Sequence, residues 1–348
     1  MKVKTLTLKL ELFYNKNNIN QKEFVFSNER DKNMDVKILA DSIKSNIQRV
    51  IIGKDQVIDI VITALISGGH VLLEDVPGTG KTVLARSLAK SVNCDFKRVQ
   101  FTPDLMPSDL TGINYYNQKL GEFTLRKGPI FTNILLADEI NRATPRTQSS
   151  LLECMEEQQV SIDGTTHILD KPFFVIASQN PVESQGTFPL PEAQLDRFLI
   201  KINMGYPTLE EGKQIFKRFI EGNPLEELKG ICEKEDILKA REMSKRIFVS
   251  DDIQEYILKI VNETLNNENI ILGVSPRGSL SMLKACQVYA AINGRNFVNP
   301  DDVKTLAPFI FSHRLIIKNS LRIKGTSNED VISEVLGKVQ VPTEAWNK

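Results

Sequence analysis

The sequence is poor in the side chains that build disulfide scaffolds and metal centres. It has four cysteines and three histidines, scattered along the chain without a CxxC pair. Structural zinc sites need such ligands at short, regular spacing. We therefore expect no zinc site and four reduced thiols, which indicates an intracellular, cytoplasmic protein. The residues concerned are Cys94, Cys154, Cys232, Cys286, His70, His167 and His313.

Net charge and long apolar runs are also lacking. The 44 Lys and Arg residues balance 44 Asp and Glu residues, so bulk charge does not favour a nucleic-acid coat, although a local basic patch stays open. No apolar run reaches the roughly 18 residues of a membrane span. Lys9 and Glu11 interrupt the first apolar stretch, which argues against a signal peptide. At 348 residues, an ordinary globular composition predicts about two domains.

The first 33 residues differ from the rest. Residues 4–13 alternate in the manner of a strand, whereas polar residues dominate 15–33. We interpret 1–33 as an appendage, non-native or preceding a mis-assigned start, with Met34 as the alternative translation start.

From Asp35 onward, helical and strand-like patterns alternate. Apolar residues at helical spacing predict two helices before and after Gly53. Buried strands separated by helices predict an α/β domain over 34–206, with a parallel sheet covered on both faces. Residues 207–348 read as a second, all-helical domain. Strands are predicted at 70–74, 96–101, 133–138, 173–178 and 198–203, and late helices at 209–221, 234–246, 251–266, 277–292, 300–317 and 328–336.

Two segments do not fit simple alternation of strands and helices. Residues 112–128 contain two short strand-like pieces, and 159–169 contain two more around an Asp163-Gly164 turn. Both are predicted to be hairpin insertions on the surface.

A glycine-rich turn joins the first predicted strand to a helix. The string EDVPGTGKT at 74–82 follows a strand and opens a helix, the context of a phosphate-binding loop. Backbone N–H groups and the helix N-terminus can surround an anion, while Lys81 reaches the β- and γ-phosphates. Asp75 stands where the first glycine of GxxxxGK[ST] is expected. The nucleotide-binding residues are predicted to be Pro77, Gly78, Thr79, Gly80, Lys81, Thr82 and Val83.

Two carboxylates end the strand at 133–138. Asp138 can hold a water on Mg²⁺, which Thr82 can also bind through its hydroxyl. Glu139 can polarise the water that attacks the γ-phosphate. With the loop upstream, these residues predict a hydrolase of nucleoside triphosphates.

Several strings together resemble a MoxR-type AAA+ ATPase. They are IIGKDQVI (51–58), EDVPGTGKT (74–82), GEFTLRKGPIF (121–131), LLADEINRATPRTQSSLLECMEE (135–157), ASQNPVESQGTFPLPEAQLDRF (177–198) and VSPRGS (274–279). The resemblance covers about 34 to 336. It implies an AAA+ P-loop NTPase domain with a five-stranded parallel sheet flanked by helices, followed by a helical lid.

The resemblance also implies roles for single residues. Asn180 matches the first sensor, Arg197 the arginine finger that reaches a neighbouring subunit's nucleotide, and Arg277 a second sensor that passes nucleotide state to the lid. Ile52 and Gly53 resemble the segment that flanks adenine, which implies ATP. Local alternatives remain, such as a turn asparagine, a salt bridge of Arg197 to an acid, or a helix start at Arg277. Arg142 and Arg146 receive no role.

The family likeness implies ATP and Mg²⁺ between the α/β domain and the lid, and assembly into a homo-oligomer, as a hexameric ring. It also implies a chaperone-like role in maturation or metal-ion insertion of partner complexes, with a von Willebrand factor A domain protein as partner. The two hairpins match family insertions that face the ring pore or the client, which makes Phe123 and Leu125 candidate contact residues; the alternative is that both hairpins are loops without such a role. The alternative is a nucleic-acid motor or loader related to MCM or chelatase-type AAA+ proteins. The basic string 313–324 favours that alternative, but it is also explained as a solvated helix face, and the hairpin tips offer only Lys119. Nucleic acid is therefore not the expected partner.

Overall fold

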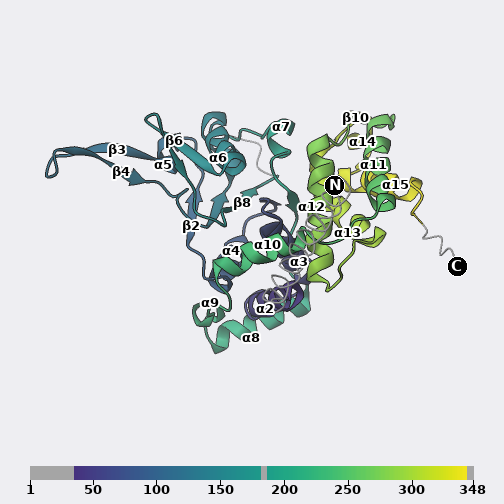
Figure 1. Cartoon of the computed structure of the whole chain (residues 1–348), viewed down its shortest axis with the longest axis horizontal. Coiled ribbons are helices and arrows are strands. Elements are labelled where there is room, and N and C mark those ends of the chain that lie inside the picture. The colour runs from purple at the N-terminus through teal and green to yellow at the C-terminus, as the bar shows by residue number, and fades with distance from the viewer. Residues whose placement is uncertain (1–34, 182–185, 343–348) are drawn as a thin grey trace, which may run out of the picture.

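A computed structural model describes residues 35–181 and 186–342. The predicted appendage at 1–33, with its strand pattern and Met34, lies outside these residues. The early part of the chain builds a sheet with helices on both faces, and the helices within residues 251–338 pack at one side of it (Figure 1). None of the helices in the described ranges is both long and apolar enough to cross a membrane.

The central sheet has five parallel strands, as predicted. Their order is β2-β5-β8-β1-β9, so β1 lies between β8 and β9. The strands are β1 (Val71–Glu74), β2 (Phe96–Gln100), β5 (Ile134–Asp138), β8 (Phe174–Gln179) and β9 (Ile200–Ile202). The carboxyl ends of β5, β8 and β1 are therefore neighbours at one edge of the sheet.

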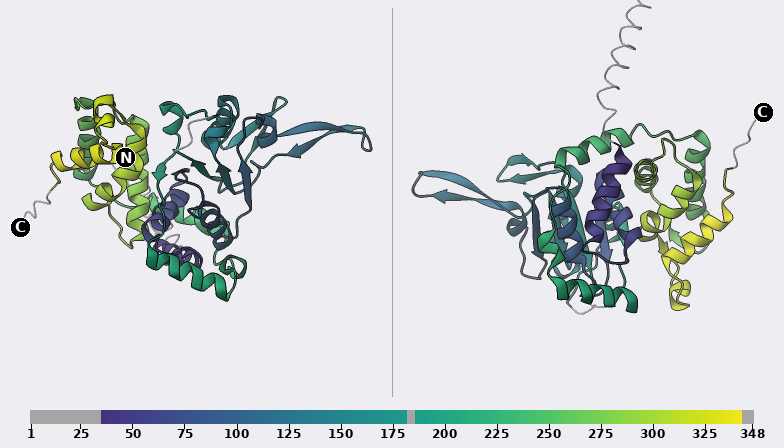
Figure 2. Two further views of the ribbon diagram at one scale, coloured as in Figure 1. Left: turned by 180° about the vertical axis from the view of Figure 1, so that it is seen from behind. Right: turned by 90° about the horizontal axis from the view of Figure 1, so that it is seen from below.

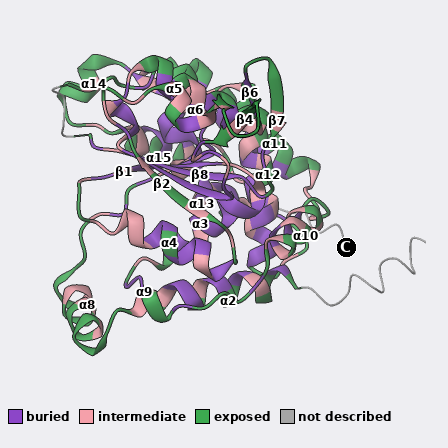
Figure 3. Cartoon of the chain, turned by 90° about the vertical axis from the view of Figure 1, so that its left-hand side faces the viewer, coloured by how far each residue is buried: buried purple, intermediate pink, exposed green. Residues whose placement is uncertain are grey.

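Helices cover both faces because strand side chains alternate between them. Val71 and Leu73 of β1 belong to one hydrophobic cluster, whereas Leu72 belongs to the cluster on the opposite face. The first cluster includes α2 (Val36–Gln48), α3 (Asp55–Ser67) and α4 (Lys81–Ser91); the second includes α5 (Pro107–Thr111) and α6 (Pro145–Glu157). Figure 3 shows the buried strands between exposed helical surfaces.

Both segments predicted as hairpins form antiparallel strand pairs. One pair is β3 (Gly112–Asn117) with β4 (Glu122–Lys127), and the other is β6 (Gln159–Ile162) with β7 (Thr165–Ile168). The β3–β4 hairpin extends well away from the body of the molecule in all views (Figures 1 and 2).

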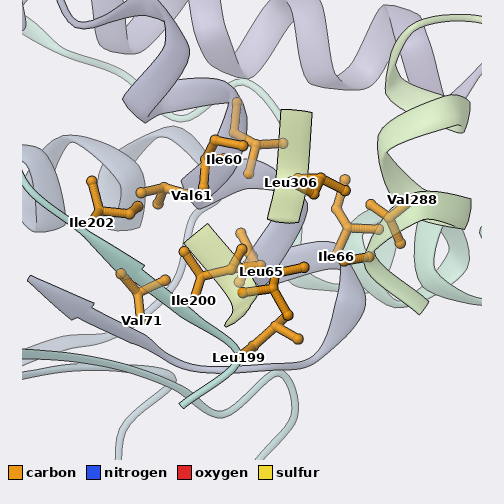
Figure 4. Close-up of a cluster of buried hydrophobic side chains, with 14 of the residues drawn as sticks. Ile60, Val61, Leu65, Ile66, Val71, Leu199, Ile200, Ile202, Val288 and Leu306 are labelled. Atoms are coloured by element: carbon orange, nitrogen blue, oxygen red, sulfur yellow. The ribbon is translucent and has the colours of Figure 1, made fainter. Parts of the chain in front are cut away.

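The late helices share their core with the α/β part. Helix α3 packs against both β9 and α12 (Pro276–Ile292), and α13 (Pro300–Phe311) packs against α12 and directly against β9. Leu65 and Ile66 therefore join Val71 and Ile200 to Val288 and Leu306 in one cluster (Figure 4). The division of the chain near Tyr206 remains a prediction. The helices that follow Tyr206 are α8 (Leu209–Glu221), α9 (Pro224–Glu227), α10 (Lys234–Ser244), α11 (Asp251–Asn266), α12 (Pro276–Ile292), α13 (Pro300–Phe311), α14 (Asn319–Ile323) and α15 (Asn328–Lys338).

The predicted helix at 300–317 is confirmed as far as Phe311 and is wrong in its last third. Helix α13 ends at Phe311, a 3₁₀ turn follows (η2, Ser312–Arg314), and Ile316–Ile317 form strand β11 against β10 (Ile270–Leu272). The β-branched pair Ile316–Ile317 suits a strand. His313 and Arg314 are buried, so they belong to the packing and not to a solvated basic face.

Candidate nucleotide-binding site

The loop between β1 and α4 has the conformation of a phosphate cradle. Gly78 and Gly80 adopt φ values of +86° and +93°, which residues with a Cβ rarely adopt. Gly80 caps α4, whose first-turn N–H groups have no partner within the helix. The Lys81 ammonium lies across the same turn, 3.0 Å from the Asp75 carbonyl and 2.9 Å from the Val76 carbonyl. These groups can bind the phosphates of a nucleotide.

Asp75 does not face the cradle. Its buried carboxylate accepts hydrogen bonds from the Val76 N–H at 2.8 Å and from the N–H groups of Met204 and Gly205, both at 3.1 Å. The acid at the place of the usual loop glycine therefore ties the phosphate loop to the segment that follows β9.

The two predicted acids lie at the end of β5. Asp138 is buried and accepts from the Ser178 hydroxyl at 2.5 Å and from Arg98 Nη2 at 2.7 Å. Glu139 adopts φ +56°, a strained backbone for this residue, of the kind that clusters at functional sites. The Glu139 Oε2 atom accepts from Gln100 at 2.5 Å and lies 3.1 Å from Arg142 Nε.

Sequence analysis missed Arg98, Gln100 and Ser178, although these residues hold both acids. Arg98 and Gln100 are on β2 and Ser178 is on β8, the two strands that flank β5. The β2–β5 register places Gln100 opposite Asp138. No motif reports such contacts, because they depend on which strands become neighbours. Arg142, left without a role, is a partner of Glu139.

Asn180 directly follows β8 and is buried. Because β8 lies between β5 and β1, the sheet brings Asn180 to the same edge as Asp138, Glu139 and Lys81. The Asn141 side chain donates to the Asn180 carbonyl at 3.5 Å.

The predicted adenine-flanking residues lie beside the start of α8. Gly53 adopts φ +71°, and a Cβ there would meet the Glu211 carboxylate. The neighbouring Lys54 ammonium is 3.3 Å from the Tyr206 carbonyl. Since Asp75 binds Gly205, the 205–211 segment connects Ile52 and Gly53 to the phosphate loop.

Arg197 and Arg277 lie at the opposite edge of the sheet. Arg197 precedes β9, where the Leu199 N–H donates to the His70 carbonyl just before β1. Arg277 lies in the first turn of α12, in the lid. The four residues of β1, about 13 Å at strand spacing, separate this edge from the phosphate loop. The structure therefore does not bring Arg277 or Arg197 to the loop of their own chain.

One carboxylate pairs with both arginines. Glu156 of α6 contacts Arg277 through one oxygen and lies 3.4 Å from Arg197 Nε through the other. All three line an open pocket of about 520 Å³, which also includes His70 and Arg314. The sequence allowed a salt bridge for Arg197, but it did not identify Glu156 as the partner.

The residues predicted to bind Mg²⁺ offer suitable atoms. Thr82 supplies a hydroxyl in the first turn of α4 and Asp138 a carboxylate, and Mg²⁺ prefers such oxygen ligands together with phosphate oxygens. Across the described ranges, no three His, Cys, Asp or Glu side chains gather as a protein-only metal site.

Comparison with known proteins matches both parts of the chain. A model for the ATPase family associated with various cellular activities covers residues 70–200, and one for the AAA lid domain covers 262–335. The chain is 41% identical to Chaperone MoxR1 of Mycobacterium tuberculosis over 85% of this chain and 80% of that protein. It is 49% identical to the uncharacterized protein YeaC of Bacillus subtilis, over 86% and 93%.

The crystal structure of a candidate ATPase from Cytophaga hutchinsonii has the same fold. The TM-score is 0.85 at 37% identity, with 92% of this chain and 99% of the other covered. Together with the five-stranded sheet and the helical lid, these likenesses establish the relationship that the motifs predict. The chain belongs to the MoxR family of AAA+ ATPases.

Proposed function

We propose that this protein hydrolyses ATP with Mg²⁺ in a homo-oligomeric ring, where each site joins the phosphate loop of one chain to Arg197 and Arg277 of the next. The observation that carries this proposal is the placement of the loop and the arginines at opposite edges of one sheet. A single chain cannot bring Arg197 to its own phosphate loop without dismantling the sheet, and Arg277 lies beside Arg197 through their shared contact with Glu156.

Each residue at the loop edge has a role in this proposal. Lys81 and the α4 N-terminus bind the phosphates, and Thr82 and Asp138 hold the Mg²⁺ that neutralises them when bound. Glu139 orients and polarises the attacking water, and Asn180 holds that water or the γ-phosphate. Gln100 and Arg142 both contact the Oε2 atom of Glu139 in the present state, so the attacking water is expected at Oε1 or in place of one of these partners.

Arg197 stabilises charge on the transferred phosphoryl group of the neighbouring chain. To do so it must leave Glu156, and so must Arg277. We infer that phosphate oxygens of the nucleotide replace the Glu156 carboxylate when two chains meet. Carboxylate and phosphate are both oxyanions that arginine binds through paired hydrogen bonds.

The work done by hydrolysis is proposed from the family. A chaperone-like role in the maturation of partner complexes fits the name of the relative Chaperone MoxR1, whereas metal-ion insertion rests on the family resemblance alone. A partner with a von Willebrand factor A domain and a ring of six chains rest on the family resemblance alone. The exposed Phe123 on the β3–β4 hairpin is the candidate contact for a client; Leu125 instead packs against the core.

The first test is Glu139→Gln. We expect this variant to bind ATP with near-normal affinity and to lose at least about a hundredfold in kcat, because a positioned base contributes that much or more. Lys81→Ala should instead lose ATP binding. Glu122→Gln, on the exposed hairpin, is the matched control and should keep full turnover. Normal turnover by Glu139→Gln contradicts the proposed site.

The second test asks whether the arginine acts between chains. Arg197→Ala alone should lose about a thousandfold in kcat or more, as expected for an arginine finger. Mixed with Glu139→Gln before assembly, it should regain activity, because each mixed interface joins an intact loop edge to an intact Arg197. Absence of recovery in verified mixed oligomers contradicts a site shared between chains.

A further inference from the structure

We propose that Arg314, a buried arginine of the lid, is the positioning residue that sets the loop carrying Arg197. This inference rests on the proposed function, since it concerns the arginine offered to a neighbouring chain. Sequence analysis placed Arg314 within a basic string and gave it no role.

Arg314 binds the backbone on both sides of Arg197. Its guanidinium is within hydrogen-bond distance of the Asp196 carbonyl at 3.2 Å, the Phe198 carbonyl at 2.7 Å and the Leu199 carbonyl at 3.2 Å. It also donates to the Asp196 carboxylate at 2.6 Å. With only 4% of its surface exposed, Arg314 has little access to water. One side chain therefore binds the backbone on both sides of Arg197.

A second lid element binds the same aspartate. The Ser275 hydroxyl donates to the other Asp196 oxygen at 3.0 Å, and Ser275 is the N-cap of α12, two residues before Arg277. The neighbouring His313 ring nitrogen lies 3.1 Å from the Phe198 carbonyl. Asp196 thus connects η2 and α12 to the loop that carries Arg197.

This network connects the loop of Arg197 and the helix of Arg277 through one residue, Asp196. Both arginines must meet the same nucleotide, although one belongs to the α/β part and the other to the lid. Because Arg314 and Ser275 join these parts at Asp196, a movement of the lid carries the loop of Arg197 with it. The two arginines would then be presented together or withdrawn together.

Only an arginine can make this set of contacts. Its planar guanidinium presents several N–H groups in fixed directions, whereas lysine has a single compact ammonium. Burying an arginine among hydrophobic residues is costly, and an apolar side chain would fill the same volume without that cost. What distinguishes Arg314 is its set of hydrogen bonds to residues 196–199.

The test variant is Arg314→Lys, which keeps the charge but loses the forked contacts. We expect at least a tenfold lower kcat in the homo-oligomer, with ATP binding and KM unchanged, because the chain's own phosphate loop is intact. Mixed with Glu139→Gln before assembly, Arg314→Lys should regain activity, since Glu139→Gln chains supply a correctly placed Arg197. A lysine that merely loosened the fold would damage the phosphate loop too and would give no recovery.

The matched control is Arg295→Lys. Arg295 pairs with the buried Asp302 in the same lid, and its side chain is 24% exposed, so it is less buried than Arg314. We expect Arg295→Lys to keep normal kcat whatever its effect on the melting temperature, because the side-chain hydrogen bonds of this pair stay within residues 295–302. Asp196→Asn, which removes the carboxylate of the same network, is the second variant. It should show the same lower kcat as Arg314→Lys and the same recovery when mixed with Glu139→Gln.

The outcomes separate this proposal from the proposed function. Unchanged kcat in folded Arg314→Lys and Asp196→Asn overturns the positioning role. The positioning role is also overturned if Arg197→Ala regains activity when mixed with Glu139→Gln but Arg314→Lys and Asp196→Asn do not. The network would then support the phosphate loop of its own chain. Failure of the Arg197→Ala mixture itself overturns the shared site, and the positioning role with it.

Discussion

His70 shows how burial sets the chemistry of a single residue in this fold. It lies just before β1, its Nδ1 accepts from the Val175 N–H at 3.0 Å, and its Nε2 is 2.9 Å from the Met155 carbonyl. These partners require a neutral ring with the proton on Nε2. Burial lowers the pKa of His70 from 6.5 to about 4, the Met155 carbonyl opposing and Arg241 reinforcing the shift.

This shift predicts a pH-dependent stability. Because the folded-state pKa is below the unfolded value, the contribution of His70 is complete above pH 6.5 and decreases as the pH falls toward about 4. For His70→Gln, whose amide can still donate to Met155, we expect a shallower dependence. Between pH 6.5 and pH 5 the free energy of unfolding should fall by about 2 kcal/mol less than in the wild type.

Urea denaturation at several pH values measures this difference. Parallel curves for the two proteins across that range contradict a buried neutral His70.

Other single residues show what sequence could and could not predict. The phosphate loop and the acids Asp138 and Glu139 follow from local strings, since strand, turn and helix are contiguous there. Gln100, Ser178 and Glu156 reach the site through the sheet register and helix packing, which no local pattern reports. Asp75 looked like a departure from a motif, yet its carboxylate binds Met204 and Gly205, more than a hundred residues away.

At the scale of elements, the β3–β4 hairpin is the segment that departs most from the body of the molecule (Figure 2). Its base is a close crossing of backbone. A Cβ on Gly112 would lie 2.2 Å from the Arg126 carbonyl, and Gly112 has φ +95° and ψ 177°, a region open essentially to glycine alone. Gly121, near the turn, has φ +69° but open space around it.

The two glycines make a matched pair of variants. Gly112→Ala should open the base of the hairpin, so amide hydrogen exchange across 112–127 should accelerate about tenfold or more. Gly121→Ala meets only the backbone cost of a left-handed residue, about 1 kcal/mol, and should accelerate exchange by a few-fold and only near the turn. Mass-spectrometric exchange on folded protein measures both, and equal effects contradict the close crossing.

Element prediction succeeded where the pattern is long and regular. All five strands of the sheet were predicted from buried runs bounded by turns, and most late helices from their periodicity. It failed at 312–317, where a helix period seemed to continue. There the polar residues His313 and Arg314 are buried because they bind the carbonyls of Phe198 and Leu199, contacts more than a hundred residues apart in sequence.

For the whole molecule, a site shared between chains predicts that activity depends on concentration. At saturating ATP, turnover per chain should rise steeply as the protein is concentrated, because an isolated chain lacks an arginine contribution worth roughly a thousandfold or more. Turnover and sedimentation should be measured on the same dilution series. Constant turnover per chain in samples that contain monomers alone contradicts a shared site.

The opposed edges of the sheet also limit which assemblies can work. In a dimer with twofold symmetry, both chains apply the same patch, so a site is complete only if that one patch contains both the loop edge and the arginine edge. These edges lie at opposite ends of the strands, which favours a head-to-tail contact between unlike surfaces. Such a contact repeats until rotation returns to the first chain, giving a closed circle, or else continues as a helical filament. Small changes in the angle between two chains at the Arg197 edge therefore decide between a closed assembly of fixed size and a filament of unlimited length.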